Sequence, residues 1–214
     1  GMNYEIEGVF LSHPHADHVC GMADLLEVCR PKCIYVPVSW DHYPPADSVR
    51  GCIDRIQELN IPIKTLSAGD AIQLSENVSM KVLHPTAGIF ADSANDDSMV
   101  LQMEYGDCRA LFCADVPAES APESIGDIDI LKTAHHGSRD SMNADLIQKT
   151  SPSVAIVSAD HASNPKHPDA QTIAYLQGSG AAVYRTDECG AITCTLNTDG
   201  SVQVQTYLSP EVSE

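Results

Sequence analysis

A short histidine-rich motif near the N-terminus carries the clearest chemistry in this chain. Three imidazoles and one carboxylate stand within six residues, His13-Pro14-His15-Ala16-Asp17-His18. On an extended segment, His13, His15 and Asp17 are spaced two apart and leave the same face, whereas His18 points elsewhere. Adjacent residues can therefore serve two neighbouring cations. Imidazole and carboxylate ligands suit zinc, manganese or iron, and a mixed set with an open position is typical of catalytic sites.

Such a site predicts hydrolysis without a side-chain nucleophile. Two divalent cations about 3.5 to 4 Å apart lower the pKa of a bridging water towards about 7 and supply hydroxide at neutral pH. They also neutralise charge that develops on a phosphoryl or carbonyl oxygen. No GxSxG motif is present, and no cysteine stands beside a convincing base. We therefore predict two divalent metal ions, with zinc preferred over manganese or iron.

Two further groups of polar residues follow apolar runs later in the chain. Asp115 comes at the end of one such run and either binds a metal or caps a helix ahead of Pro117. The pair His135-His136 precedes Gly137-Ser138 and forms either part of a site or a solvated turn. For both groups, the sequence leaves a structural role and a role in the site open.

One more histidine and two cations stand near these candidates. His167 lies in the loop Asn164-Pro-Lys-His-Pro168, either as a site residue or as a surface group ahead of a helix. Arg139 and Lys166 are two of only twelve Lys and Arg residues, and each lies beside a candidate site residue. Their placement predicts an anion-binding rim.

The elements around the first motif alternate in type. Apolar periodicity predicts strand, helix, strand, helix and strand over 9–12, 21–30, 33–37, 47–60 and 61–66. The first strand ends directly at the histidines, which then lie on a loop. This alternation favours parallel pairing in an α/β layer structure.

The later elements change character. Short alternating segments at 71–74, 78–83, 99–105 and 109–114 predict an antiparallel meander. Beyond it we expect strands at 128–132, 154–158 and 182–184, helices at 142–150 and 169–177, and a hairpin from 191–196 and 202–207. The mixture indicates sheets sandwiched between helices.

Several motifs together resemble a known family. The segment Phe10-Leu-Ser-His-Pro-His-Ala-Asp-His-Val-Cys-Gly21 resembles the HxHxDH signature of the metallo-β-lactamase superfamily. Four later segments resemble the hydrolase domain of ComEC-type DNA-internalisation competence proteins: Leu111-Phe-Cys-Ala-Asp115, Asp129-Ile-Leu-Lys-Thr-Ala-His-His-Gly-Ser138, His167-Pro168 and Tyr184-Arg-Thr-Asp-Glu-Cys-Gly-Ala-Ile192. The likeness runs from about Ile6 to Tyr207. It implies an α/β (α+β) fold, a four-layer αβ/βα sandwich, here without the family's N-terminal strands.

The resemblance also implies roles for individual residues. The first metal would be bound by His13 and His15, the second by Asp17, His18 and His136, and Asp115 would bridge the two. The residues expected to act on the substrate are Asp17, His135 and His167, with His135 or His167 hydrogen-bonding a nonbridging oxygen or protonating the leaving group. Our candidate substrate-binding residues are Ser138, Arg139 and Lys166.

The chain departs from the family pattern in two places. The superfamily usually supplies a third histidine to the first metal, and only His42 and His84 lie in that interval. Either a carboxylate of Asn95-Asp96-Asp97-Ser98 completes the site or this acidic turn is merely solvated. Family members also carry a glycine-rich hairpin ahead of the first strand. Here either the N-terminus is truncated or a sheet edge is exposed, which would invite a homodimer.

Composition limits the partners and the compartment. The 214 residues carry a formal net charge of −18, which disfavours long nucleic acid and favours a small-molecule or short phosphodiester substrate. Eight cysteines among apolar neighbours indicate free thiols and a cytoplasmic location, although an outward-facing one follows if an N-terminal segment is missing. No apolar run is long enough to span a membrane. We expect one domain over residues 1–214, with Gly1 as a tag remnant.

Three functions follow from these observations. The first is a phosphodiesterase or nuclease-like hydrolase, favoured by the ComEC-type resemblance. The second is a hydrolase of esters, lactones or thioesters that uses the same hydroxide. The third is a noncatalytic metal-binding module of a DNA-uptake or envelope assembly.

Overall fold

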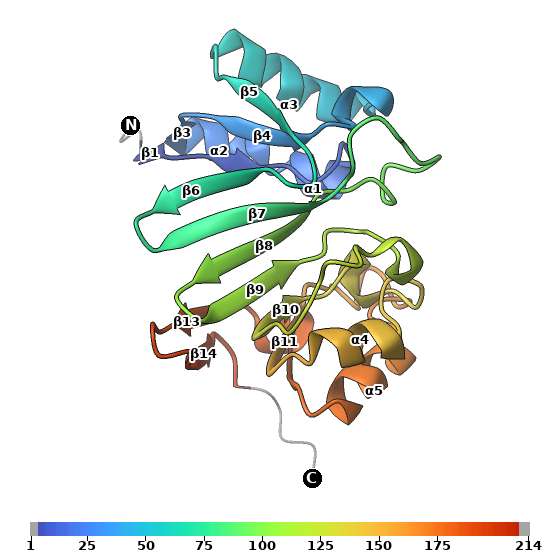
Figure 1. The fold of residues 1–214 in the computed structure, drawn as a ribbon. Coiled ribbons are helices and arrows are strands. Elements are labelled where there is room, and N and C mark those ends of the chain that lie inside the picture. The colour runs from blue at the N-terminus through green and yellow to red at the C-terminus, as the bar shows by residue number, and fades with distance from the viewer. Residues whose placement is uncertain (1–3, 210–214) are drawn as a thin grey trace. The chain divides into compact units, whose positions relative to one another are not determined.

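The computed structural model describes residues 4–209, and the chain forms two compact units. The first unit comprises the chain up to Asp70 together with Val82–Met99, and the second comprises Ala71–Lys81 and the chain from Val100 onwards. Figure 1 shows the chain as a ribbon coloured by residue number. The inferred tag remnant, Gly1, lies outside the described residues. Our expectation of a single domain stays a prediction.

Parallel strands form the sheet of the first unit. Strands β2 (Val9–Phe10), β4 (Ile34–Pro37) and β5 (Ile63–Leu66) pair in the order β2-β4-β5, and β1 (Tyr4–Ile6) pairs with β3 (Cys29–Pro31). The connecting helices are α1 (Ala16–Val19), α2 (Met22–Val28), the 3-10 helix η1 (Trp40–His42) and α3 (Asp47–Glu58). The predicted parallel order is confirmed. Parallel pairing brings the carboxyl ends of β2, β4 and β5 to one edge.

The core of the first unit explains these helices. Helix α3 buries Val49, Cys52 and Ile56, one face at helical spacing, against a cluster that includes Leu26 and Ile34. The prediction that the preceding helix continues to residue 30 was wrong. Helix α2 ends at Val28 because Cys29 adopts extended backbone and pairs with Tyr4.

A seven-stranded sheet organises the second unit. Its order is β12-β11-β10-β9-β8-β7-β6, built from Ala182–Arg185, Val154–Val157, Ile130–Lys132, Cys108–Phe112, Val100–Tyr105, Val78–His84 and Ala71–Ser75. Pairing is antiparallel between β6 and β7 and between β8 and β9, as the meander predicted. Pairing is parallel from β9 through β12. The last residues of β7 belong to the first unit.

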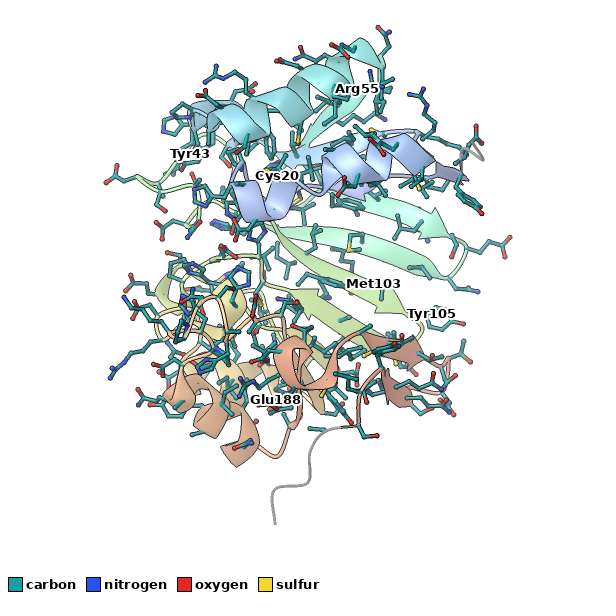
Figure 2. All side chains as sticks on the ribbon, turned by 180° about the vertical axis from the view of Figure 1, so that it is seen from behind. Cys20, Tyr43, Arg55, Met103, Tyr105 and Glu188 are labelled. Carbon is teal, nitrogen blue, oxygen red and sulfur yellow. The ribbon has the colours of Figure 1, made fainter. Side chains whose placement is uncertain are left out.

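Helices and a hairpin complete the second unit. Helices α4 (Ala144–Thr150) and α5 (Ala170–Gly178) lie side by side (Figure 1) and begin at the capping residues Asn143 and Asp169. The remaining elements are η2 (Ala118–Ser120), η3 (His135–Gly137), α6 (Thr186–Cys189), β13 (Ile192–Leu196) and β14 (Val202–Thr206). The predicted hairpin is β13 and β14, whereas α6 was not predicted. Met103, on β8 (Figure 2), packs with the hairpin against Ala110, Ile130 and Val154.

The cysteines and the helix lengths bear on two other expectations. All eight cysteines are free thiols, five of them buried, which confirms that prediction. Among residues 4–209, no helix is both long and apolar enough to cross a membrane.

Candidate metal centre

Three imidazoles gather in the first unit directly after β2. The ring of His13 lies 4.5 Å from that of His15 and 4.2 Å from that of His18, measured between centroids. Nε2 of His13 is 3.0 Å from Nδ1 of His15. Two nitrogen ligands of a tetrahedral zinc ion would stand roughly 3.3 Å apart at ordinary bond lengths. The donor set and its spacing therefore fit a bound metal.

The backbone of the motif differs from the predicted extended loop. His15 is extended, with φ −89° and ψ 152°, but α1 begins at Ala16 and takes in Asp17 and His18. The amide of Cys20 donates to the carbonyl of Ala16, which closes the helical turn. The alternation we assumed thus ends after His15. Oδ2 of Asp17 lies 3.6 Å from Nε2 of His18, so these two polar atoms are close despite the change of backbone.

Ser12 positions two of the imidazoles. Its hydroxyl oxygen lies 3.1 Å from Nδ1 of His13 and 3.1 Å from Nδ1 of His18. An oxygen with two lone pairs can accept both N–H groups, which leaves the lone pairs of the two Nε2 atoms for a metal. Sequence reasoning gave Ser12 no role. The available signal was its position between the strand and His13.

The acidic turn ahead of β8 makes hydrogen bonds that stabilise the loop to which it belongs. The Asp97 carboxylate, 4% exposed, accepts hydrogen bonds from the Tyr43 hydroxyl at 2.5 Å and from the Ala91 amide at 2.8 Å. Nε2 of His84 lies 2.7 Å from the Asp96 carbonyl oxygen. These contacts favour a structural role for His84 and Asp97 over metal binding. Burial, and then the hydrogen bond and charge of Asp97, raises the pKa of Tyr43.

The second unit brings a carboxylate and an imidazole to one sheet edge. Strands β9 and β10 are parallel neighbours, with Ala110 opposite Ile130, so the residues after them share the carboxyl edge. Asp115 is 3% exposed and its Oδ2 lies 3.9 Å from Nε2 of His135. The backbone amide of His135 donates to the Ala114 carbonyl at 2.8 Å, which joins the two segments.

A hydrogen bond to a backbone carbonyl determines which ring nitrogen of His136 can bind a metal. Its Nδ1 lies 2.9 Å from the Ser158 carbonyl oxygen, just beyond β11. A carbonyl oxygen only accepts, so Nδ1 carries the proton and Nε2 carries the lone pair. Metal-binding histidines are commonly oriented in this way. The arrangement suits the predicted assignment of His136 as a ligand.

The turn that presents these histidines has unusual backbone. His135, His136 and Gly137 have φ values of 44°, 55° and 74° in succession. Left-handed backbone at a residue other than glycine costs of order 1 to 3 kcal/mol and concentrates at functional sites. A Cβ on Gly137 would meet Pro168 Cβ at 2.9 Å and Val157 Cγ1 at 3.1 Å, so only glycine fits there. The hydroxyl oxygen of Ser141 lies 2.9 Å and 2.8 Å from the two carbonyl oxygens that flank the turn, so its single proton can be donated to either.

His167 joins this cluster. Its ring centroid lies 5.6 Å from that of His135 and 6.5 Å from that of His136. Its buried Nδ1 has no hydrogen-bond partner among residues 4–209. Burial, followed by the charges of His135 and His136, lowers the pKa of His167 and favours the neutral ring. The structure therefore brings together the histidines that we assigned to substrate contact and proton transfer.

The predicted substrate-binding residues differ in exposure. Ser138 is buried and its carbonyl accepts from the Thr172 hydroxyl at 3.2 Å, whereas Arg139 and Lys166 are exposed. Their roles stay predictions. Sequence reasoning overlooked Lys132, whose Nζ donates to the Thr133 carbonyl at 3.0 Å. Burial lowers the pKa of Lys132, while Cys113 and Asp115 partly offset that effect.

Each unit carries residues of the kinds that hold metal ions. His13, His15, Asp17 and His18 belong to the first, and Asp115 and His136 to the second. Their types are those that transition metals prefer. The family model for the metallo-beta-lactamase superfamily matches residues 2–161. The chain belongs to the metallo-β-lactamase superfamily. Its mixed α/β fold with a large sheet agrees with the fold class expected from the sequence.

One relative is similar over most of the chain. ComE operon protein 3 of Bacillus subtilis (strain 168) is 29% identical over 193 residues, which are 88% of this chain and 24% of that protein. The chain thus spans about a quarter of the relative it matches. This finding supports the resemblance to ComEC-type proteins seen in the motifs.

Solved structures agree on the metallo-β-lactamase fold. CmlA from Streptomyces venezuelae, a diiron β-hydroxylase, gives a TM-score of 0.60 at 14% identity, over 96% of this chain and 46% of that one. A putative metal-dependent hydrolase from Parabacteroides distasonis gives 0.55 at 15% identity, over 86% and 77%. At these identities the likeness concerns the fold alone.

Proposed function

We propose that this chain is a metal-dependent hydrolase that cleaves phosphodiesters. The observation that carries the proposal is the close set of His13, His15 and His18, two of whose rings are oriented by the hydroxyl of Ser12. We further propose that this set binds a pair of cations together with Asp115 and His136. When bound, such a pair supplies an activated water at neutral pH and neutralises charge on the phosphoryl group.

The chain's own residues would orient the substrate and move protons. His135 and His167, with ring centroids 5.6 Å apart, can donate a hydrogen bond to a nonbridging oxygen or protonate the leaving group. The exposed cations Arg139 and Lys166 would attract the anionic substrate. Ser12 and the Ser158 carbonyl would hold the ligand imidazoles in the required tautomers.

The substrate class rests on the His-His-Gly-Ser motif and the ComEC-type likeness. A formal charge of −18 disfavours long polyanions, so the preferred substrate would be a short or small phosphodiester. The identity of the metal would depend on which ion is available, because histidine and carboxylate ligands accept zinc, manganese or iron. The similar S. venezuelae protein is a diiron enzyme.

A substrate panel tests the proposal. Protein reconstituted with zinc, manganese or iron is assayed on bis(p-nitrophenyl) phosphate and single-stranded DNA, and in parallel on a lactone and a thioester. We expect phosphodiester cleavage that a chelator abolishes and that added metal restores, with two metal ions per chain by elemental analysis. Turnover of only the lactone or thioester would assign the site to the other substrate class. Metal binding without any turnover would favour a noncatalytic module.

We also propose that the domain works in a reducing compartment. All eight cysteines are free thiols, the state that cytoplasmic proteins maintain. Cell fractionation tests this, and recovery of the protein with cell-surface markers would contradict it.

A further inference from the structure

An exposed nonpolar tip stands out in the first unit. Ile89 is 78% exposed and Phe90 is 37% exposed, on the loop that connects β7 to β8. The Phe90 ring lies 5.1 Å from the ring of His42, at an interplanar angle of 41°. His42 in turn meets Tyr43 edge-on at 5.0 Å and 88°. Two planar side chains thus share one partly open surface, which we call the ring platform (His42 and Phe90).

The platform has a fixed base. The Tyr43 hydroxyl lies 2.8 Å from the Ala91 carbonyl oxygen, one residue beyond Phe90. Asp97 links Tyr43 and the Ala91 amide, and its own carbonyl accepts from the Ser39 hydroxyl at 3.1 Å. These bonds connect the loop to Ser39 and Tyr43, the residues that flank η1 in the chain. A surface that is ordered in advance loses less conformational entropy when it binds a ligand.

The platform lies at the same edge of the first-unit sheet as the histidine motif. The motif follows the carboxyl end of β2, and η1 follows the carboxyl end of the neighbouring parallel strand β4. The loop that bears Phe90 ends at Met99, whose amide donates to the Ser12 carbonyl at 2.9 Å. Figure 2 shows Tyr43 and Arg55 at opposite ends of α3, with Tyr43 at its start. Ligands in parallel α/β sheets bind at this edge.

Charge decides what the platform can accept. Asp41 and Asp92 are exposed nearby in the chain, and the charges of Asp92 and Asp96 reach Tyr43. A phosphate group would be repelled here, whereas an uncharged planar ring would not. Aromatic side chains stack on any nucleobase, because every base has a π-face.

We propose that the ring platform stacks a nucleobase of the substrate, so that this chain prefers nucleotide phosphodiesters. The proposal rests on the proposed phosphodiesterase function and specifies its substrate. Phe90 would bind the ring, while the charged part of the substrate extends towards the histidine motif.

Equilibrium binding tests the proposal without turnover. The probe is 2-aminopurine riboside 5′-monophosphate, whose fluorescence is quenched by stacking, with ribose 5-phosphate as the ringless comparison, on metal-loaded protein. We expect Phe90→Ala and Phe90→Leu each to weaken probe binding about tenfold, the scale of one lost base stack, and Phe90→Tyr to retain it. Ribose 5-phosphate should bind parent and variants alike.

The control is a substitution of an exposed apolar residue away from the ring platform. Ile63→Ala removes another exposed apolar side chain, 42% exposed, from the amino end of β5, and should leave probe binding unchanged. Equal probe affinity in the parent and Phe90→Ala, or no probe binding by the parent, overturns the platform. Retention in Phe90→Leu also overturns stacking, because an aliphatic contact would then suffice. Hydrolysis of bis(p-nitrophenyl) phosphate by the parent is measured separately, so a failure of the hydrolase proposal is distinguishable.

Discussion

The imidazole rings of the two histidine groups are oriented in different ways. In the first unit, His13 and His18 are oriented by a side-chain hydroxyl, that of Ser12, and neither residue has a positive φ. In the second unit, His136 is oriented by a backbone carbonyl, and it stands on left-handed backbone. The first arrangement depends on one replaceable side chain, whereas the second depends on the path of the chain. Substitutions should therefore act differently on the two groups.

The largest effect should come from removing the second unit's buried carboxylate. Asp115→Asn is expected to lower phosphodiester hydrolysis by more than about a hundredfold, because a neutral amide is a poor metal ligand. Metal content per chain should fall as well. The matched control is Asp54→Asn, on the exposed side of α3. Parent-level metal content and rate in Asp115→Asn would mean that the first unit binds the metals without it.

Two serine variants test the difference in orientation. Ser12→Ala is expected to weaken metal affinity about 10- to 100-fold, the usual effect of losing a group that orients a ligand. Ser158→Ala should leave affinity unchanged, because it keeps the carbonyl that His136 uses. Isothermal titration calorimetry with zinc measures the metal affinity of both variants. Equal affinities in the two variants would remove the distinction between the groups.

Two glycine variants test the difference in backbone. Gly137→Ala should destabilise the protein by about 1 to 3 kcal/mol, because φ is 74° and the new Cβ would meet Pro168. Gly21→Ala, after the first motif, should change stability by less than about 0.5 kcal/mol, since φ is −61° and the space is open. Urea unfolding curves give both values. A tolerated Gly137→Ala would show that the second turn can relax.

The smallest effect should come from the loop beside the first group. Tyr43→Phe removes the hydrogen bond to Asp97 and should cost about 1 kcal/mol of stability. The raised pKa of Tyr43 means that folding favours the neutral phenol. Its contribution is fully present below about pH 10, the ordinary pKa of tyrosine, and is lost as the pH rises further.

Unfolding measured between pH 8 and 11 checks this prediction. The difference between parent and Tyr43→Phe should narrow above about pH 10. Tyr4→Phe, at a 59% exposed tyrosine, is the control and should match the parent throughout. A constant difference across the range would contradict the proposed linkage.

The same contrast explains what could be predicted from the sequence. The first motif and its flanking strands were predicted because ligand spacing and apolar periodicity are local properties. The predicted alternation failed at Asp17, because a hydrogen bond from the Cys20 amide to the Ala16 carbonyl closes a helical turn. This helix has only four residues, too few to show helical periodicity in the sequence. The partner of His136 could not be predicted, because a backbone carbonyl 22 residues away has no signature in the sequence.

Other parts of the site were hidden for related reasons. Gly137 was the only sequence sign of a left-handed turn, and His135 and His136 gave none. The acidic stretch before β8 left two interpretations open, a metal ligand or a solvated turn, and neither predicted that Asp97 is buried and accepts hydrogen bonds from Tyr43 and Ala91. Tyr43 is more than forty residues away from Asp97 in the sequence. Pairings at that range require the folded chain.

The left-handed turn has a consequence for how this chain tolerates change. Glycine, asparagine and aspartate adopt positive φ with less strain than histidine does. A substitution of His135 or His136 by asparagine would therefore relax the backbone while it removes an imidazole. Selection or engineering for thermal stability alone would replace these two histidines first. Only a requirement for their chemistry opposes such substitutions.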